Sequence, residues 1–96
     1  MSTLNEILSL LSLNKESLKN KYNIKTLGIF GSYSRGDFHK NSDIDIIVEF
    51  EKSPGYEFID LADELEIILK KKVDLVSKKA IKPKYLNYIY SEIKYA

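Results

Sequence analysis

The sequence has no cysteine, no tryptophan and no long hydrophobic run, and its formal net charge is only +1. The lack of cysteine excludes disulfide bonds, thiolate zinc sites and cysteine nucleophiles. No stretch approaches the roughly 20 apolar residues of a membrane-spanning helix, and no basic-then-apolar leader opens the chain. A nearly neutral chain gives no electrostatic reason to expect direct nucleic-acid binding. We therefore expect a cytoplasmic protein that works neither in a membrane nor on nucleic acid.

Several common kinds of functional site are also missing. His39 is the only histidine and lies in a polar stretch, so we expect an exposed side chain rather than a metal ligand. No Gly-Lys-Ser or Gly-Lys-Thr follows a glycine, which excludes a P-loop. The apolar residues 46–48 occupy positions where a calcium loop needs polar ligands. The chemistry of this chain must therefore come from other residues.

What is present is the composition of a small globular protein. The 96 residues are 44% hydrophobic and 30% charged, and tyrosine and phenylalanine supply all the aromatic side chains. This length suits one compact domain over residues 1–96 and is too short for two. A domain of this size buries only about two-thirds of its unfolded surface, so its stability is expected to depend partly on a partner.

The hydrophobic pattern predicts an α+β fold, an α/β sandwich in which helices pack on a small mixed sheet of three to four strands. A helix is predicted to begin at a capping box, Thr3-x-x-Glu6, to break at residues 12–14 and to resume over 15–22. The other predicted elements are strands over 25–30, 43–50 and 73–77, a loop over 31–42 that includes at most one helical turn, a helix over 58–69, and a final helix from Pro83.

The final helix carries an unusual number of tyrosines. Its predicted core face consists of Leu86, Ile89, Tyr90 and Ile93, and its opposite flank of Tyr85, Tyr88 and Tyr95 together with Glu92. Exposed tyrosines are enriched at protein interfaces, but tyrosine is also simply frequent in this lysine- and asparagine-rich sequence. Both interpretations of this flank stay open.

The strand over 43–50 places two acids on one face. Apolar residues alternate onto one side of it, which leaves Asp43 and Asp45 on the other side, about 7 Å apart. A solvated strand face would explain such a pair by itself. Close carboxylates repel one another, however, unless a cation lies between them. Oxygen ligands with no nearby histidine or cysteine favour Mg²⁺ or Mn²⁺ over zinc.

Two further features favour a functional site over a solvated face. Asp74 lies within the apolar strand Val-Asp-Leu-Val, where a hydrophobic residue is expected. Gly31 and Ser32 follow a predicted strand directly. A glycine there allows close backbone approach to a ligand, and the serine offers its hydroxyl to phosphate oxygens.

The spacing of these residues resembles a known family. Gly31-Ser32, ten residues, and then Asp43-Ile44-Asp45 are similar to the Gly-Ser-x10-Asp-x-Asp signature of the DNA-polymerase-β-like nucleotidyltransferases. The segment Gly-Ser-Tyr-Ser-Arg-Gly over 31–36 resembles the Gly-Ser-x-Ala-Arg-Gly form of the minimal nucleotidyltransferase (MNT) branch, with Ser34 in place of the usual alanine. The resemblance covers essentially the whole chain and implies a nucleotidyltransferase-like fold.

The resemblance also implies roles for individual residues. Gly31 and Ser32 would bind the triphosphate of a nucleotide. Asp43 and Asp45, with Asp74 as the third ligand, would hold two Mg²⁺ ions, or Mn²⁺ in their place. Asp74 would lie nearest the attacking hydroxyl and would accept its proton. Apart from the resemblance, the position of Arg35 in a glycine-flanked loop leaves two roles open, contact with a phosphate or carboxylate and a surface salt bridge to Asp37.

The family resemblance further implies a partner and a reaction. MNT proteins typically pair with a HEPN-domain toxin, so we expect an antitoxin that forms a hetero-oligomer with such a toxin and transfers AMP from ATP to one of its hydroxyls, a tyrosine. The chain has no room for the extra domains of relatives that act on nucleic acid or small molecules. An alternative is an antitoxin that neutralises its partner by complex formation with little or no catalysis.

Overall fold

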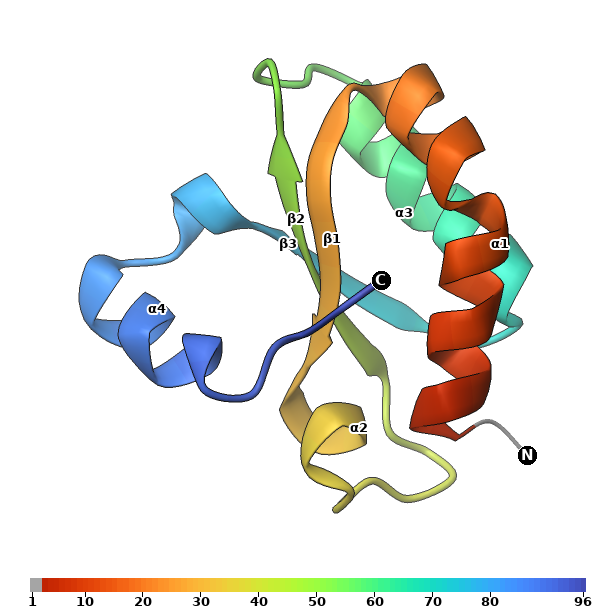
Figure 1. The fold of residues 1–96 in the computed structure, drawn as a ribbon, viewed down its shortest axis with the longest axis vertical. Coiled ribbons are helices and arrows are strands. Elements are labelled where there is room, and N and C mark those ends of the chain that lie inside the picture. Colours follow the sequence, from red (N-terminus) through yellow and green to blue (C-terminus); the bar gives the residue numbers. More distant parts are fainter. Residues whose placement is uncertain (1–2) are drawn as a thin grey trace.

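The computed structural model describes residues 3–96 as one mixed sheet with helices on both of its faces (Figure 1). The elements are α1 (Leu4–Tyr22), β1 (Ile24–Phe30), α2 (Gly31–Arg35), β2 (Ile44–Phe50), α3 (Glu57–Leu69), β3 (Val73–Ser77), the 3₁₀ turn η1 (Lys78–Ala80), α4 (Pro83–Tyr90) and β4 (Lys94–Tyr95). The prediction of an α+β fold with a small mixed sheet is confirmed.

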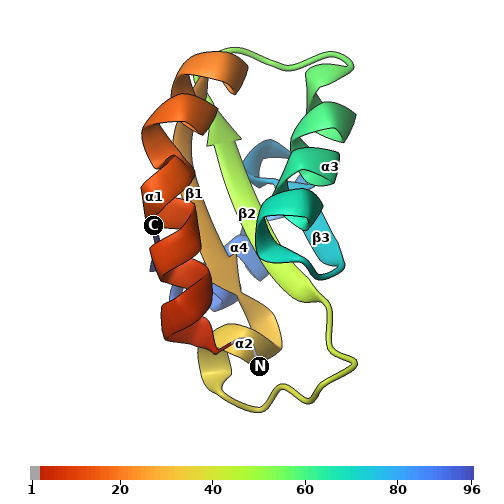
Figure 2. The ribbon, with the colours of Figure 1, turned by 90° about the vertical axis from the view of Figure 1, so that its right-hand side faces the viewer.

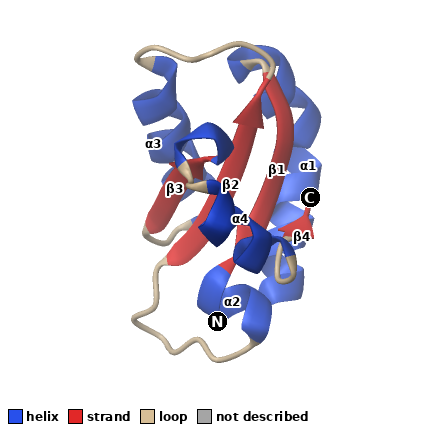
Figure 3. Cartoon of the chain, turned by 90° about the vertical axis from the view of Figure 1, so that its left-hand side faces the viewer, coloured by secondary structure: helices blue, strands red, loops and turns tan. Residues whose placement is uncertain are grey.

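The sheet has the strand order β3-β2-β1-β4. The inner strand β1 is antiparallel to both of its neighbours, whereas β2 and β3 are parallel and are joined through α3. Helices α1 and α3 lie side by side on one face of the sheet (Figure 2). Helix α4 lies on the other face, in front of β1 and β2 in Figure 3.

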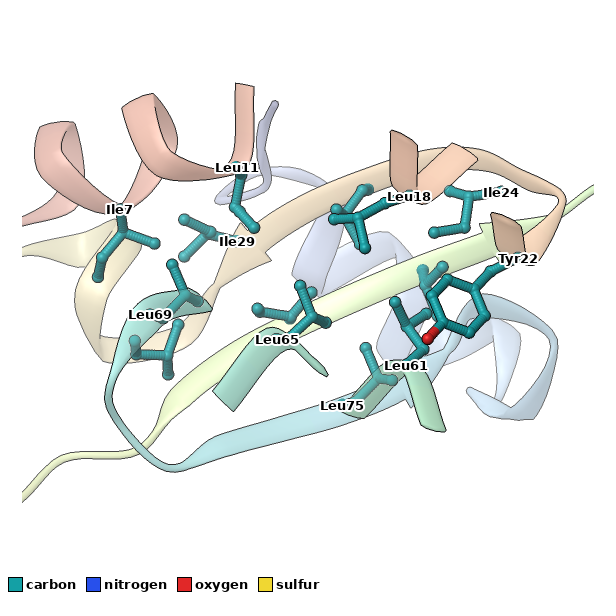
Figure 4. Close-up of a cluster of buried hydrophobic side chains, with 14 of the residues drawn as sticks. Ile7, Leu11, Leu18, Tyr22, Ile24, Ile29, Leu61, Leu65, Leu69 and Leu75 are labelled. Carbon is teal, nitrogen blue, oxygen red and sulfur yellow. The ribbon is translucent and has the colours of Figure 1, made fainter. Parts of the chain in front are cut away.

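The core lies between the sheet and helices α1 and α3. Figure 4 shows Leu11 of α1, Leu65 of α3 and Ile29 of β1 pointing into this space, and all three are fully buried. The strand β2 contributes Ile44, Ile46 and Val48 to the same face, which confirms the predicted alternation. The acids that alternate with them therefore belong to the face of the sheet opposite the core.

Helix α1 is continuous, and the predicted break at residues 12–14 is wrong. The side-chain amide of Asn14 donates to the carbonyl of Leu10 at 2.8 Å, so it bonds to the helix backbone instead of ending the helix. Leu11 and Leu18, seven residues apart, are both buried, and only a continuous helix keeps them on one face. The predicted start is confirmed, because the Thr3 hydroxyl accepts from the Glu6 N–H.

The C-terminal segment differs most from the prediction. Helix α4 ends at Tyr90, so Glu92, Ile93 and Tyr95 are not part of it. Lys94 and Tyr95 instead form β4, which pairs with Ile29 and Gly28 at the free edge of β1. A Cβ at Gly28 would lie 2.7 Å from Ile93 Cγ2, so only glycine lets this segment approach so closely. In α4 itself the predicted faces are partly correct, since Leu86 and Ile89 are half-buried and Tyr85 and Tyr88 are exposed, but Tyr90 is exposed as well.

A hydrogen bond between α1 and α3 gives a first test of this packing. The buried Tyr22 hydroxyl donates to Glu64 Oε1 at 2.6 Å, and Lys21 Nζ lies 3.0 Å from the same oxygen. The Tyr22 hydroxyl, and secondarily Lys21, lowers the pKa of Glu64 below its usual value. We expect Tyr22→Phe to reduce the free energy of unfolding by about 1–2 kcal/mol at pH 7, because it removes a hydrogen bond to a charged group.

This loss depends on pH in a defined direction. The folded-state pKa of Glu64 lies below its ordinary value of 4.5, so the stabilisation is complete above that pH and disappears as the pH falls through the folded-state value. Urea unfolding at pH 7 and pH 3 measures the effect. Tyr88→Phe, which alters an exposed tyrosine, is the matched control and should leave the free energy of unfolding unchanged at both pH values. If Tyr22→Phe lowered the free energy of unfolding equally at both pH values, the stabilisation would not come from the hydrogen bond to the ionised Glu64 carboxylate.

Candidate functional site

The predicted nucleotide-binding residues stand where β1 ends. Phe30 is extended, and Gly31 then turns the chain with a φ of +72°, in the left-handed region that favours glycine. Gly31 is buried and Ser32 is half-buried, as the first residues of the short helix α2. The turn ends at Gly36, whose N–H donates to the Ser32 carbonyl at 2.9 Å. The loop predicted after this strand therefore begins with the one helical turn that was expected.

Asp45 lies at the centre of the predicted site. On one side it is the register partner of Phe30 in β1, and on the other it is the register partner of Asp74 in β3. Its side chain rests directly against Gly31, where an added Cβ would come within 2.1 Å of Asp45 Oδ2. The structure thus brings Gly31, Asp45 and Asp74 together at one end of the sheet, although they are far apart in sequence.

Asp43 flanks this group from the segment just before β2. It is exposed, as is Asp74, whereas the Ile44 side chain between Asp43 and Asp45 is fully buried in the core. The core residue fixes the strand so that its neighbours face away from the core. Two of the three predicted carboxylates are therefore open to large molecules from outside.

The electrostatics of the site are dominated by the crowding of acids. Burial, and then the charges of Asp74 and Asp43, raise the pKa of Asp45 to about 6, with Arg35 acting in the opposite direction. Each of these causes except Arg35 disfavours the ionised carboxylate. The site therefore contains negative charge that a bound cation would relieve.

A divalent metal suits the chemistry of these groups. The donors are carboxylate oxygens, which Mg²⁺ prefers, and no histidine or cysteine stands among them. Within residues 3–96, no three acidic or imidazole side chains converge into a preformed metal-binding cluster. Asp45 and Asp74 are the carboxylates that the strand register brings side by side, and they are the pair best placed to share an ion.

Sequence reasoning left Arg35 undecided and placed Glu92 wrongly. The predicted salt bridge to Asp37 exists, with Arg35 Nε 3.0 Å from Asp37 Oδ2. Arg35 Nη1 also lies 3.0 Å from Glu92 Oε2, and the same oxygen accepts from the Gly31 N–H at 2.6 Å. Glu92 is thus at the site and not on a solvated helix flank. Nothing in the sequence around it signals this position, because it results from the pairing of β4 with β1.

A cavity of 280 Å³ lies elsewhere, lined by residues that include Phe50, Pro54 and Ser77. These residues belong to the ends of β2 and β3 and the loop after β2, whereas Asp45 and Asp74 stand near the starts of the two strands. The predicted site is therefore separate from this cavity, and its carboxylates Asp43 and Asp74 are open to solvent. An open site is better suited to a macromolecular acceptor than to an enclosed small molecule.

Comparison with known proteins identifies the family. The family model described as "Polymerase beta, Nucleotidyltransferase" matches residues 14–94. This chain is a member of that family. The prediction of a nucleotidyltransferase is thereby confirmed, and proteins of this family generally use divalent metal ions. In residues 3–96 we find no helix with the length and apolar character required to cross a membrane.

Relatives in the family carry names that refer to protein adenylylation. The protein adenylyltransferase MntA of Thermococcus cleftensis is 40% identical over 96 residues, which cover 99% of this chain and 97% of that protein. A protein of Methanocaldococcus jannaschii, provisionally named a protein adenylyltransferase, is 50% identical over 82 residues, or 84% of this chain and 95% of that protein. These relatives match the nucleotidyltransferase along nearly their full length.

Solved structures agree with this assignment. A toxin–antitoxin crystal structure with AMP-PNP has a chain that matches with a TM-score of 0.70 and 29% identity, over 98% of this nucleotidyltransferase and 72% of that chain. A second structure holds a tri-AMPylated HEPN toxin of Shewanella oneidensis in complex with an MNT antitoxin. It matches with a TM-score of 0.59 and 26% identity, over 96% of this chain and 66% of that one. The predicted resemblance to the MNT branch is confirmed.

Proposed function

We propose that this nucleotidyltransferase transfers AMP from ATP to a hydroxyl, that of a tyrosine, on a HEPN-type toxin, and that it acts as the antitoxin of that toxin. The observation that carries the proposal is the placement of Asp45 beside Asp74 and against Gly31. This placement supports an in-line transfer, because charge-stabilising carboxylates would lie next to the turn that we propose binds the phosphates. The names of the relatives support adenylylation of a protein.

In this mechanism Gly31 and Ser32 would bind the triphosphate, and Asp43, Asp45 and Asp74 would hold two Mg²⁺ ions. Metal ions bound there would supply positive charge to neutralise the negative charge that develops on the phosphates. The hydroxyl oxygen of the acceptor attacks the α-phosphorus, the bond from that phosphorus to the bridging oxygen of the β-phosphate breaks, and pyrophosphate leaves. Asp74, exposed at the outer side of the pair, accepts the proton of the attacking hydroxyl.

The exposure of the site supports a protein acceptor. Asp43 and Asp74 are open to solvent, so a side chain on the surface of another protein can reach them. Helix α4, on the same face of the sheet, presents Tyr85 and Tyr88 to the outside. A partner that docks there would bring its own hydroxyl to the carboxylates, and the two chains would form a hetero-oligomer.

One assay tests this function. The chain is incubated with the HEPN-type protein encoded by a neighbouring gene, ATP and Mg²⁺, and the neighbour is weighed by intact mass spectrometry. We expect mass increments of whole AMP units, which disappear with Asp43→Ala plus Asp45→Ala. The matched control is Asp60→Ala plus Asp63→Ala, two exposed acids of α3, which should leave the increments unchanged. A stable complex without any increment would favour neutralisation by complex formation alone.

A further inference from the structure

Glu92 occupies a fixed position among the groups at the end of β1. It lies in the turn after α4, and its side chain is only 12% exposed. A single oxygen, Oε2, accepts from the Gly31 N–H at 2.6 Å and from Arg35 Nη1 at 3.0 Å. A charged acceptor makes both of these hydrogen bonds stronger than neutral ones. Glu92 therefore joins the first and last residues of α2.

The backbone around Glu92 is anchored on both sides. Its own N–H donates to the Ile89 carbonyl at 2.9 Å, and its carbonyl accepts from the Ser34 hydroxyl. Two residues later Lys94 pairs with Ile29 of β1, and the Ala96 N–H donates to the Leu27 carbonyl at 2.9 Å. The Glu92 carboxylate thus belongs to a segment that is itself hydrogen-bonded to the sheet. Its position is therefore fixed by the backbone on both sides.

The residues that Glu92 holds are the ones beside the predicted catalytic carboxylate. Gly31 is in the left-handed region of backbone conformation, and the side chain of Asp45 fills the space that a Cβ at Gly31 would need. Gly31 is therefore the point where the predicted phosphate-binding turn meets the carboxylate of Asp45. Arg35, the cation of this turn, is held between Glu92 and Asp37.

We propose that Glu92 is a positioning residue, which holds the turn over 31–35 in the geometry that binds the triphosphate. The role in transfer rests on the proposed function, whereas the role in nucleotide binding does not depend on turnover. In this proposal the turn binds the nucleotide and takes no part in the bond changes at the α-phosphorus, so its loss should weaken nucleotide binding more than it slows the chemical step. The C-terminal segment then belongs to the active site even though it lies outside the Gly-Ser and Asp-x-Asp motifs.

The test compares Glu92→Ala with Glu92→Gln. Glutamine keeps an oxygen for the Gly31 N–H and loses only the charge near Arg35, whereas alanine loses both contacts. We expect Glu92→Ala to raise the Kd for Mg²⁺–AMP-PNP and the KM for ATP about tenfold, with kcat within about threefold of wild type. Glu92→Gln should change the two constants by no more than about threefold. Glu51→Ala and Glu51→Gln, at an exposed glutamate after β2, are the matched controls.

A spectroscopic measurement reports the contact without any nucleotide. The amide proton of Gly31 should move upfield in Glu92→Ala, because it loses its short hydrogen bond to Glu92, and should move less in Glu92→Gln, which keeps an oxygen acceptor. An unchanged Kd in folded Glu92→Ala, or tighter binding of AMP-PNP, would overturn the proposal; tighter binding would mean that the carboxylate competes with the triphosphate. A wild-type chain that binds AMP-PNP but transfers nothing would refute the proposed function and would leave this test intact.

Discussion

Asp45→Asn is expected to abolish AMP transfer and, in the absence of divalent metal, to make the protein more stable. The loss of activity follows from removing a charge that the reaction needs; metal-assisted charge stabilisation is worth several kcal/mol, so transfer should fall about a thousand-fold or more. The gain in stability follows from the crowding of acids. Burial and the neighbouring Asp74 and Asp43 disfavour the ionised form of Asp45, which an uncharged amide of similar shape avoids.

The gain in stability of Asp45→Asn should be modest and should depend on pH. After allowance for solvent screening at a half-buried group we expect about 1 kcal/mol, which raises Tm by about 4–8 °C in a domain of this size. The folded-state pKa of Asp45, about 6, lies above its ordinary value of 3.8, so the ionised carboxylate destabilises the folded protein at pH 7. As the pH falls through 6 toward 4, Asp45 becomes protonated and the wild type regains this stability. The advantage of Asp45→Asn should therefore shrink over that range.

Thermal unfolding in EDTA at pH 7.5 and pH 4.5 measures both effects, and Asp63→Asn, at an exposed acid of α3, is the control. Added Mg²⁺ should raise the Tm of wild type more than that of Asp45→Asn, because a ligand that binds only the folded state stabilises it. If Asp45→Asn had a lower Tm than wild type in EDTA, the Asp45 carboxylate would stabilise the metal-free protein, and the prediction would be wrong.

The face of the sheet on which the three predicted carboxylates lie could be predicted, because it depends on patterns that are local in sequence. Alternation alone places Asp43 and Asp45 opposite the core, because each strand residue points away from its neighbour. The same rule applied to β3 places Asp74 on that face. That Asp45 and Asp74 are direct register partners is a relation between strands, and only the structure supplies it.

The C-terminal segment could not be predicted in the same way. The strand β4 has two residues, too few to show any period, and its pairing with β1 joins residues more than 60 positions apart. Gly28 makes that pairing possible, yet a glycine inside a strand does not indicate which segment will approach it. Glu92 reaches Gly31 and Arg35 only because this long-range pairing forms, so a helical pattern extended from α4 assigned it to the wrong surface.

Gly31→Ala should be the most damaging single substitution at the turn, since it meets two separate obstacles. The first is conformational, because a φ of +72° costs a residue with a Cβ about 1–2 kcal/mol. The second is steric, because the new Cβ would lie 2.1 Å from Asp45 Oδ2 and 2.9 Å from Asp45 Cγ. We expect a total loss of about 3 kcal/mol or more in the free energy of unfolding, together with loss of transfer, as Asp45 is pushed out of place.

Gly36 provides a control that separates the two obstacles. It also has a positive φ, +88°, but an added Cβ there meets nothing within 4 Å, so Gly36→Ala should lose only the conformational 1–2 kcal/mol. Combining Gly31→Ala with Asp45→Ala removes the collision and should bring the loss back toward that of Gly36→Ala, which a double-mutant cycle by urea unfolding measures directly. If Gly31→Ala and Gly36→Ala destabilise the chain equally, Asp45 does not pack against Gly31 in solution. The contact that joins the Gly-Ser motif to the Asp-x-Asp motif would then be absent.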